Sequence, residues 1–165
     1  MKRFMRERGQ SLVELGVSLV ILLYLLSGAA EFGVLFFQFV QLRDAAQEGA
    51  LYGSMNPWVD SPSGIYNDGK FETGEAINQA EIETRVRAAS SSPIDLTDTT
   101  NVLVTIVSTD AGGKLCEGAG IQVTVSYRHK IFMPFMAALL GRTADPTIPL
   151  SATVVDTILT PLCGP

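Results

Sequence analysis

The chain has 165 residues, 47% of them hydrophobic, a size that suits one small domain in addition to a membrane anchor. Its formal net charge is −5 at pH 7, and no basic cluster follows the first residues, so nucleic-acid binding lacks its usual electrostatic basis. The sequence also contains no phosphate-loop, dinucleotide or nucleophile-elbow motif. We therefore expect no enzyme, no cofactor or metal site and no small-molecule substrate.

A short basic leader opens the chain. Residues 1–9 hold four cations and one acidic residue, Glu7. Basic residues beside a membrane span tend to stay on the cytoplasmic side. This pattern predicts a cytoplasmic leader and an exported remainder.

Residues 10–54 are predicted to form one long helix that serves as membrane anchor and stalk. Residues 15–30 are uncharged and cover about 24 Å as a helix, less than the roughly 30 Å hydrocarbon core, so the span must extend past Glu14, Glu31 or both. The apolar stretch is too long for a removed signal peptide, which favours a retained single-pass anchor. Asn56-Pro57 then ends the helix, because proline pushes the preceding residue out of the α region.

Small residues recur on this helix at a spacing of four. Ala45, Gly49 and Gly53 share one face of the stalk, and Ala29 and Gly33 form a similar pair within the span. Small side chains allow close approach of another backbone, so we expect packing at the first set and a helix–helix contact at the second. The alternative is chance, since glycine and alanine are frequent in membrane helices.

Glu31 is a second carboxylate in the same apolar helix. Two hypotheses account for it: it reaches the outer interface because the span runs from Leu12 to Ala30, or it faces another helix and forms a hydrogen bond there. The interface hypothesis is favoured, because the residues beyond Glu31 suit a helix that emerges into a packed assembly.

The start of the helix carries a recognisable motif. Gly9, then Gln10-Ser11-Leu12-Val13-Glu14, behind a basic leader and ahead of an apolar helix, resembles the class III signal of type IV pilins and pseudopilins. Together with the segment at residues 43–50, RDAAQEGA, it resembles more narrowly the TadE-like family, the minor pseudopilins of tight-adherence (Tad, or Flp) pilus systems. The resemblance covers roughly the first third of the chain. One departure is Leu15, where many Tad pseudopilins have tyrosine.

The resemblance implies a function. A prepilin peptidase would cut after Gly9, Gln10 would become the new amino terminus, and Glu14 would pair with the amino terminus of an adjoining subunit. The expected partners are the lipid bilayer, the peptidase, other pilin or pseudopilin subunits and the Tad assembly machinery, and the expected location is the inner membrane. The alternative is a permanently anchored single-pass envelope protein with an extracytoplasmic binding domain, in which Gly9 is never cut.

Residues 55–165 are expected to form an extracytoplasmic α+β head. A short amphipathic helix is predicted from Thr73 to the serines at 90–92, with Ile77, Ile82 and Val86 on its apolar side. β-rich runs at 102–107, 121–128 and 148–155 predict a three-stranded antiparallel sheet with one wet face, since residues 121–128 alternate between apolar and polar.

Three further features belong to the head. Residues 132–141 are apolar and predict a short buried or membrane-surface helix that Gly141 closes. Cys116 and Cys163 both fall on the exported side, where a disulfide bond can persist; the alternative is two free thiols. His129, flanked by Arg128 and Lys130, is predicted to lie on the surface.

Overall fold

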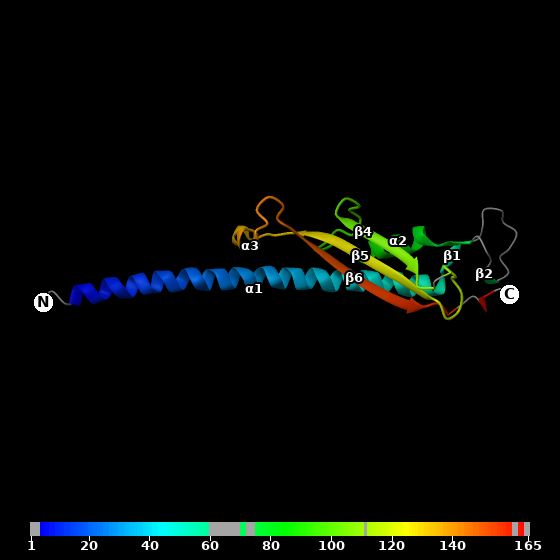
Figure 1. The fold of residues 1–165 in the computed structure, drawn as a ribbon, viewed down its shortest axis with the longest axis horizontal. Coiled ribbons are helices and arrows are strands. Elements are labelled where there is room, and N and C mark those ends of the chain that lie inside the picture. The colour runs from blue at the N-terminus through cyan, green and yellow to red at the C-terminus, as the bar shows by residue number, and fades with distance from the viewer. Residues whose placement is uncertain (1–3, 60–69, 72–74, 111, 160–161, 164–165) are drawn as a thin grey trace. The chain divides into compact units, whose positions relative to one another are not determined.

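The computed structural model describes residues 4–59, 70–71, 75–110, 112–159 and 162–163, and the side chains of residues 4–8, 70–71, 134–135 and 162–163 are not described. A long amino-terminal helix is followed by a head with a short helix and a three-stranded antiparallel sheet, which confirms the α+β class (Figure 1). The elements are α1 (Phe4–Met55), β1 (Trp58–Val59), β2 (Lys70–Phe71), β3 (Ala76–Ile77), α2 (Gln79–Ala88), β4 (Val102–Ser108), β5 (Gly120–Lys130), α3 (Pro134–Leu139), β6 (Thr147–Thr157) and β7 (Leu162–Cys163).

The contacts within the chain define two compact units. The first, here the span unit, joins residues 1–36 to residues 129–148, and the second, the head unit, joins residues 37–128 to residues 149–165. The chain passes between the units three times, within α1, within β5 and within β6. The boundaries expected from the sequence, between leader and helix after residue 9 and between helix and head after residue 54, stay a prediction.

From Leu12 to Leu26, α1 is an apolar helix with exposed side chains. The predicted helix at 10–54 is confirmed, although it begins earlier, at Phe4, and ends at Met55. Leucines from Leu12 to Leu26 are each more than half exposed. Among the residues that the structure describes, α1 is the one helix long and apolar enough to cross a membrane. Lipid is the environment that suits such a surface.

In the head unit, α1 packs through its small residues. Ala45 is 1% exposed and Gly49 and Gly53 are buried, as the spacing predicts. A Cβ added at Gly49 would lie 2.4 Å from Cγ2 of Val86, and one added at Gly53 would lie 2.8 Å from Cδ1 of Ile121. These glycines therefore let α1 approach both α2 and β5 more closely than any larger residue would allow.

The amphipathic helix α2 starts later than predicted. Ile82 and Val86 are fully buried, as expected, but the helix begins at Gln79 rather than near Thr73. Ile77 instead belongs to β3 and lies opposite Trp58 of β1 in an antiparallel pair. The prediction of the start was wrong because this pairing joins segments distant in sequence, and helical periodicity within one window cannot show it.

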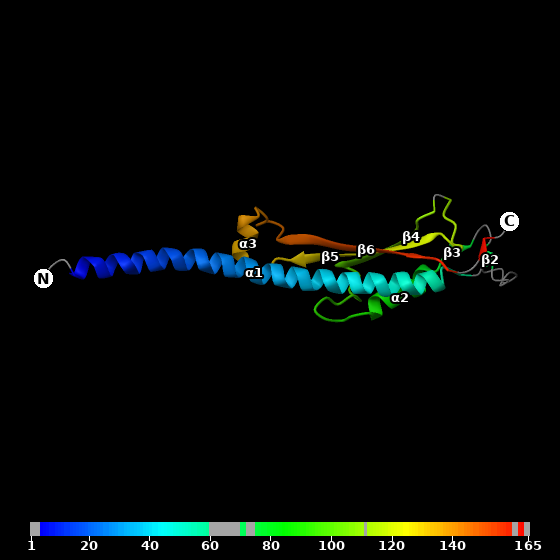
Figure 2. The ribbon, with the colours of Figure 1, turned by 90° about the horizontal axis from the view of Figure 1, so that it is seen from below.

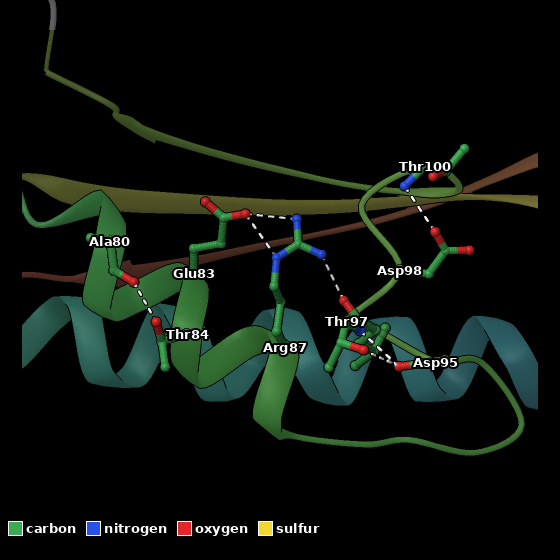
Figure 3. A network of polar contacts seen from close by, with 9 residues as sticks. Ala80, Glu83, Thr84, Arg87, Asp95, Thr97, Asp98 and Thr100 are labelled. Atoms are coloured by element: carbon green, nitrogen blue, oxygen red, sulfur yellow. Dashed lines mark hydrogen bonds and ion pairs between the residues drawn. The ribbon is translucent and has the colours of Figure 1, made fainter.

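Polar contacts connect α2 to the loop that follows it (Figure 3). Arg87 donates from Nε to Glu83 at 2.8 Å and from Nη1 to the carbonyl oxygen of Leu96 at 2.7 Å. Farther along the loop, Asp98 accepts hydrogen bonds from the backbone N–H of Thr100 at 2.9 Å and from Nδ2 of Asn101 at 2.7 Å. These bonds order the chain between α2 and β4.

The same loop is tied to α1 by one buried side chain. Gln41 donates from Nε2 to the carbonyl oxygen of Ile94 at 2.8 Å and accepts at Oε1 from the Ile94 N–H at 3.0 Å. Its Nε2 also lies 2.9 Å from Oγ of Ser90. The amide thus pairs with a buried backbone segment in the way that a neighbouring strand would.

The three-stranded sheet has the order β4-β5-β6. The strands β4 and β5 are antiparallel, with Val102 opposite Tyr127 and Ser108 opposite Ile121. Between β5 and β6, hydroxyl groups pair at Thr124–Thr153 and Ser126–Ser151, at 2.9 and 3.1 Å. The alternation predicted for residues 121–128 is confirmed, since these hydroxyls occupy one face while the other face buries three residues completely: Ile121, Val123 and Val125.

The helix α3 lies in the span unit and is short. Its last residue is Leu139, and Gly141 closes it, as predicted: Gly141 has a φ of +66°, and the N–H of Arg142 donates to the carbonyl oxygen of Ala137 at 2.8 Å. Ala137 is buried, but Leu139 is 72% exposed and Leu140 50% exposed. The buried alternative for this helix is therefore wrong, and the membrane-surface alternative stays a prediction.

Candidate functional site

The predicted processing and assembly residues lie near the start of α1. Gly9, Gln10 and Glu14 are all exposed, and no atom among the described residues lies within 4 Å of a Cβ added at Gly9. Nε2 of Gln10 donates to Oε1 of Glu14, one helical turn later, at 3.2 Å. Leu12 and Leu15, beside Glu14, are 69% and 63% exposed. The carboxylate is therefore displayed on an apolar helix surface, where a charge costs several kcal/mol unless a partner compensates it.

The small residues of the span are also displayed. Ala29 and Gly33 are both exposed, and no described atom lies within 4 Å of a Cβ added at Gly33. They contrast with Gly49, whose α-carbon is covered by Val86 of the same chain. This face is thus open to another helix, and the helix–helix contact stays a prediction.

Glu31 is the centre of a buried polar cluster in the span unit. Its side chain is 4% exposed and accepts three hydrogen bonds. The donors are Nε2 of His129 at 2.7 Å, the N–H of Phe132 at 3.1 Å and the N–H of Met133 at 3.0 Å. Both carboxylate oxygens are used, because Oε1 faces His129 and Phe132 while Oε2 faces Met133. Neither sequence hypothesis for Glu31 included a partner from its own chain.

His129 is buried, so the prediction of a surface histidine was wrong. Its side chain is 3% exposed and is hydrogen-bonded to Glu31. The carboxylate supplies the polar partner that a buried imidazole needs. The signal for burial was present in β5: the alternation that turns Ile121, Val123 and Val125 inward reaches His129 two residues after Tyr127.

The cluster positions a chain segment. The carboxylate is satisfied by three donors, two of them backbone groups, and so it fixes residues 129–133 against α1. The position of Glu31 also had a sequence signal. It precedes Ala45, the first of the small residues predicted to pack, by fourteen residues, so the two share one face of α1.

Other candidate sites are sparse. Cys116 is buried and disulfide-bonded, but the side chain of Cys163 is outside the described set, so the Cys116–Cys163 bond stays a prediction. Within the part of the chain that the structure describes, no group of three or more His, Cys, Asp or Glu residues is arranged to hold a metal ion.

Comparison with known protein families gives a match to the segment that carries the sequence motif, residues 9–51. Residues 9–51 match the family model described as TadE-like protein. This match confirms the resemblance over that segment, which is α1 from Gly9 almost to its end. No curated protein and no solved structure matches the chain.

Proposed function

We propose that this chain is a minor pseudopilin-like structural subunit, without enzymatic activity, that takes part in assembling a Tad/Flp-type pilus. It is held in the inner membrane by α1, with the leader in the cytoplasm and the head outside. The similarity to TadE-like proteins over residues 9–51 supports this role, as does a helix that suits a single-pass membrane protein.

The observation that carries the proposal is the exposure of the motif at the start of α1. A peptidase must reach the bond between Gly9 and Gln10, and within the described part of the chain no atom lies within 4 Å of a Cβ added at Gly9. Glu14, five residues beyond Gly9, is exposed on an apolar surface and gains a strong partner if a neighbouring subunit presents its new amino terminus there.

A second surface supports assembly with other subunits. Ala29 and Gly33 leave an open strip on the span, where a neighbouring helix could approach closely. Other pilin or pseudopilin subunits of the Tad machinery are the partners proposed for this strip, and the lipid bilayer surrounds the remainder.

The test is the mass of the mature protein in cells with and without the prepilin peptidase. A mature chain that begins at Gln10 is expected only when the peptidase is present, and Gly9→Val should abolish the shortening. Gly16→Val is the matched control, because Gly16 also lies in α1 and none of the atoms that the structure describes lies within 4 Å of a Cβ added there. It should be processed normally.

An unprocessed chain in cells that carry an active peptidase would contradict this proposal. It would instead favour the permanently anchored envelope protein. Glu14→Leu adds an independent readout, since it should leave membrane insertion intact while reducing the recovery of partner pilin subunits.

A further inference from the structure

Residues 130–142 form an apolar segment with a cation at each end. Lys130 and Arg142 flank it, and it contains no aspartate or glutamate, although the chain as a whole has a net charge of −5. Three of its large side chains are strongly exposed: Phe132 is 79% exposed, Leu139 72% and Leu140 50%. An aqueous surface is an unfavourable environment for this combination.

This segment packs on the apolar half of α1, within the span unit. Figures 1 and 2 both show α3 beside α1. A Cβ added at Gly28 would lie 3.7 Å from Sδ of Met136, and Glu31 accepts hydrogen bonds from the N–H groups of Phe132 and Met133. Met133 also lines an apolar cavity of about 510 Å³ with residues of the span: Val20, Leu23, Tyr24, Leu26, Ser27 and Ala30.

The positions of Gly28 and Glu31 along α1 give the depth of these contacts in a membrane that α1 crosses. About 20 helical residues cross the hydrocarbon core, so a span that begins near Leu12 ends near Glu31. Gly28 precedes Glu31 by one turn and would lie roughly 4–5 Å inside that boundary. The segment that contacts Gly28 therefore reaches the edge of the hydrocarbon.

We propose that residues 130–142 are a second membrane contact, inserted into the outer lipid interface beside the span. Phe132, Leu139 and Leu140 enter the boundary between headgroups and acyl chains, and Lys130 and Arg142 lie at the level of the lipid phosphates. Apolar residues flanked by cations are typical of segments that lie in this interface. The buried bonds of Glu31 hold the segment at this depth and satisfy backbone N–H groups that lipid could not.

Lipid is the occupant because the exposed side chains continue the surface of the span. The span itself exposes leucines throughout. The lipid that surrounds the span therefore also covers the exposed side chains of residues 130–142. This inference rests on α1 crossing a membrane and is independent of whether the chain joins a pilus.

The test places a fluorescent residue at the exposed positions of the full-length protein. Trp58, the one tryptophan in the sequence, is first replaced by Trp58→Phe, and Leu139→Trp is then added. The protein is reconstituted into vesicles of phosphatidylcholine and phosphatidylglycerol, with or without bromine atoms on the acyl chains near the headgroup. We expect bromination to remove roughly half of the fluorescence of Leu139→Trp, as for an interfacial side chain.

Two matched leucines serve as controls. Leu103→Trp, on β4 of the head unit and 65% exposed, should not be quenched, whereas Leu19→Trp, in the span and 52% exposed, should be. Phe132→Trp repeats the measurement at a second position of the segment, so that a local disturbance at one site does not decide the result.

Each outcome bears on the inference. If the Leu139→Trp and Phe132→Trp proteins are quenched no more than the Leu103→Trp protein, the inference is overturned. Blue-shifted emission without quenching would overturn it in favour of contact with a second copy. An unquenched Leu19→Trp protein would overturn the span, and the inference with it. None of these results depends on cleavage at Gly9.

Discussion

The side-chain amide of Gln41 and the backbone of Ile94 form two reciprocal hydrogen bonds in the interior of the head unit. The bonds measure 2.8 and 3.0 Å and join positions 53 residues apart. They satisfy both the N–H and the C=O of Ile94, a residue that is 2% exposed.

Gln41→Leu is expected to destabilise the protein by about 1–3 kcal/mol, because it leaves both backbone groups of Ile94 buried without a partner. Urea denaturation of the full-length protein in detergent measures the effect. Gln38→Met is the matched control on the same helix. Among the described residues Oε1 of Gln38 is buried without a hydrogen-bond partner, so replacing Gln38 should cost less than replacing Gln41. Equal losses in the two variants would argue against a specific role for the Gln41 amide.

Gly49→Ala is expected to cost about 1–3 kcal/mol, because its Cβ would lie 2.4 Å from Cγ2 of Val86, a fully buried side chain with stiff geometry. The same denaturation experiment applies. Gly33→Ala is the control, since the space around Gly33 is open and alanine favours the helix by about 0.5–1 kcal/mol. A neutral Gly49→Ala would mean that α1 and α2 pack less closely than the structure shows. If Gly33→Ala weakens subunit recovery without loss of stability, Gly33 contacts another helix.

Asp98 should make the head unit sensitive to acid. The side-chain amide of Asn101 and the backbone N–H of Thr100 donate to this carboxylate and lower its pKa. Figure 3 shows the bond from Thr100. A lowered pKa contributes stability that is present above the unfolded value, about 3.9, and is lost as the pH falls through the folded pKa. Asp98→Asn should therefore lower the denaturation midpoint at pH 7, and the difference from the unmodified chain should shrink as the pH falls below the unfolded value and through the lowered pKa of Asp98. A difference that persists in acid would assign the effect to packing instead.

Glu31→Ala is expected to release residues 130–142, because it leaves a buried histidine and two backbone N–H groups without their acceptor. Limited trypsin digestion of the protein in vesicles measures this release as cleavage after Lys130 and Arg142, which are both exposed. Each 1.4 kcal/mol lost should raise the cleavage rate about tenfold. Glu31→Gln, which keeps one acceptor oxygen, should give an intermediate rate. Glu14→Ala should not change it; if it does, the effect is not specific to the Glu31 contacts.

A bond between Cys116 and Cys163 should protect both thiols. Alkylation of the denatured, non-reduced protein is expected to label neither cysteine, and prior reduction should lower stability by up to about 4 kcal/mol in the chain-entropy account. Full labelling of both before reduction would exclude the bond.

Local periodicity was sufficient to predict the regular elements of the fold. The uncharged runs on either side of Glu31 predict α1, and strict alternation from Ile121 to Tyr127 predicts β5 with the correct inward face. The positive φ of Gly141 likewise follows from a glycine at the end of an apolar run.

The contacts between distant segments were not predictable in this way. The start of α2 was wrong because β1 and β3 pair across a long loop, and the Gln41–Ile94 bonds have no signature in either local window. The Glu31–His129 contact joins residues 98 apart, and its two members were interpreted separately, one as an interfacial carboxylate and one as a surface histidine. A burial signal existed for each, but only the fold shows that the two side chains meet.

The division of the chain into units has a practical consequence for producing a soluble fragment. Cutting α1 at Phe36 would remove the surface on which residues 129–148 pack, and would leave Met133 and Met136 facing water and His129 without its carboxylate. Such a fragment should aggregate. The Thr124–Thr153 and Ser126–Ser151 pairs place Arg128 opposite Pro149 in the same register. Replacing residues 129–148 with an Asn-Gly turn would therefore close β5 and β6 into a direct hairpin, and a fragment from Phe37 with this replacement should stay in solution without detergent.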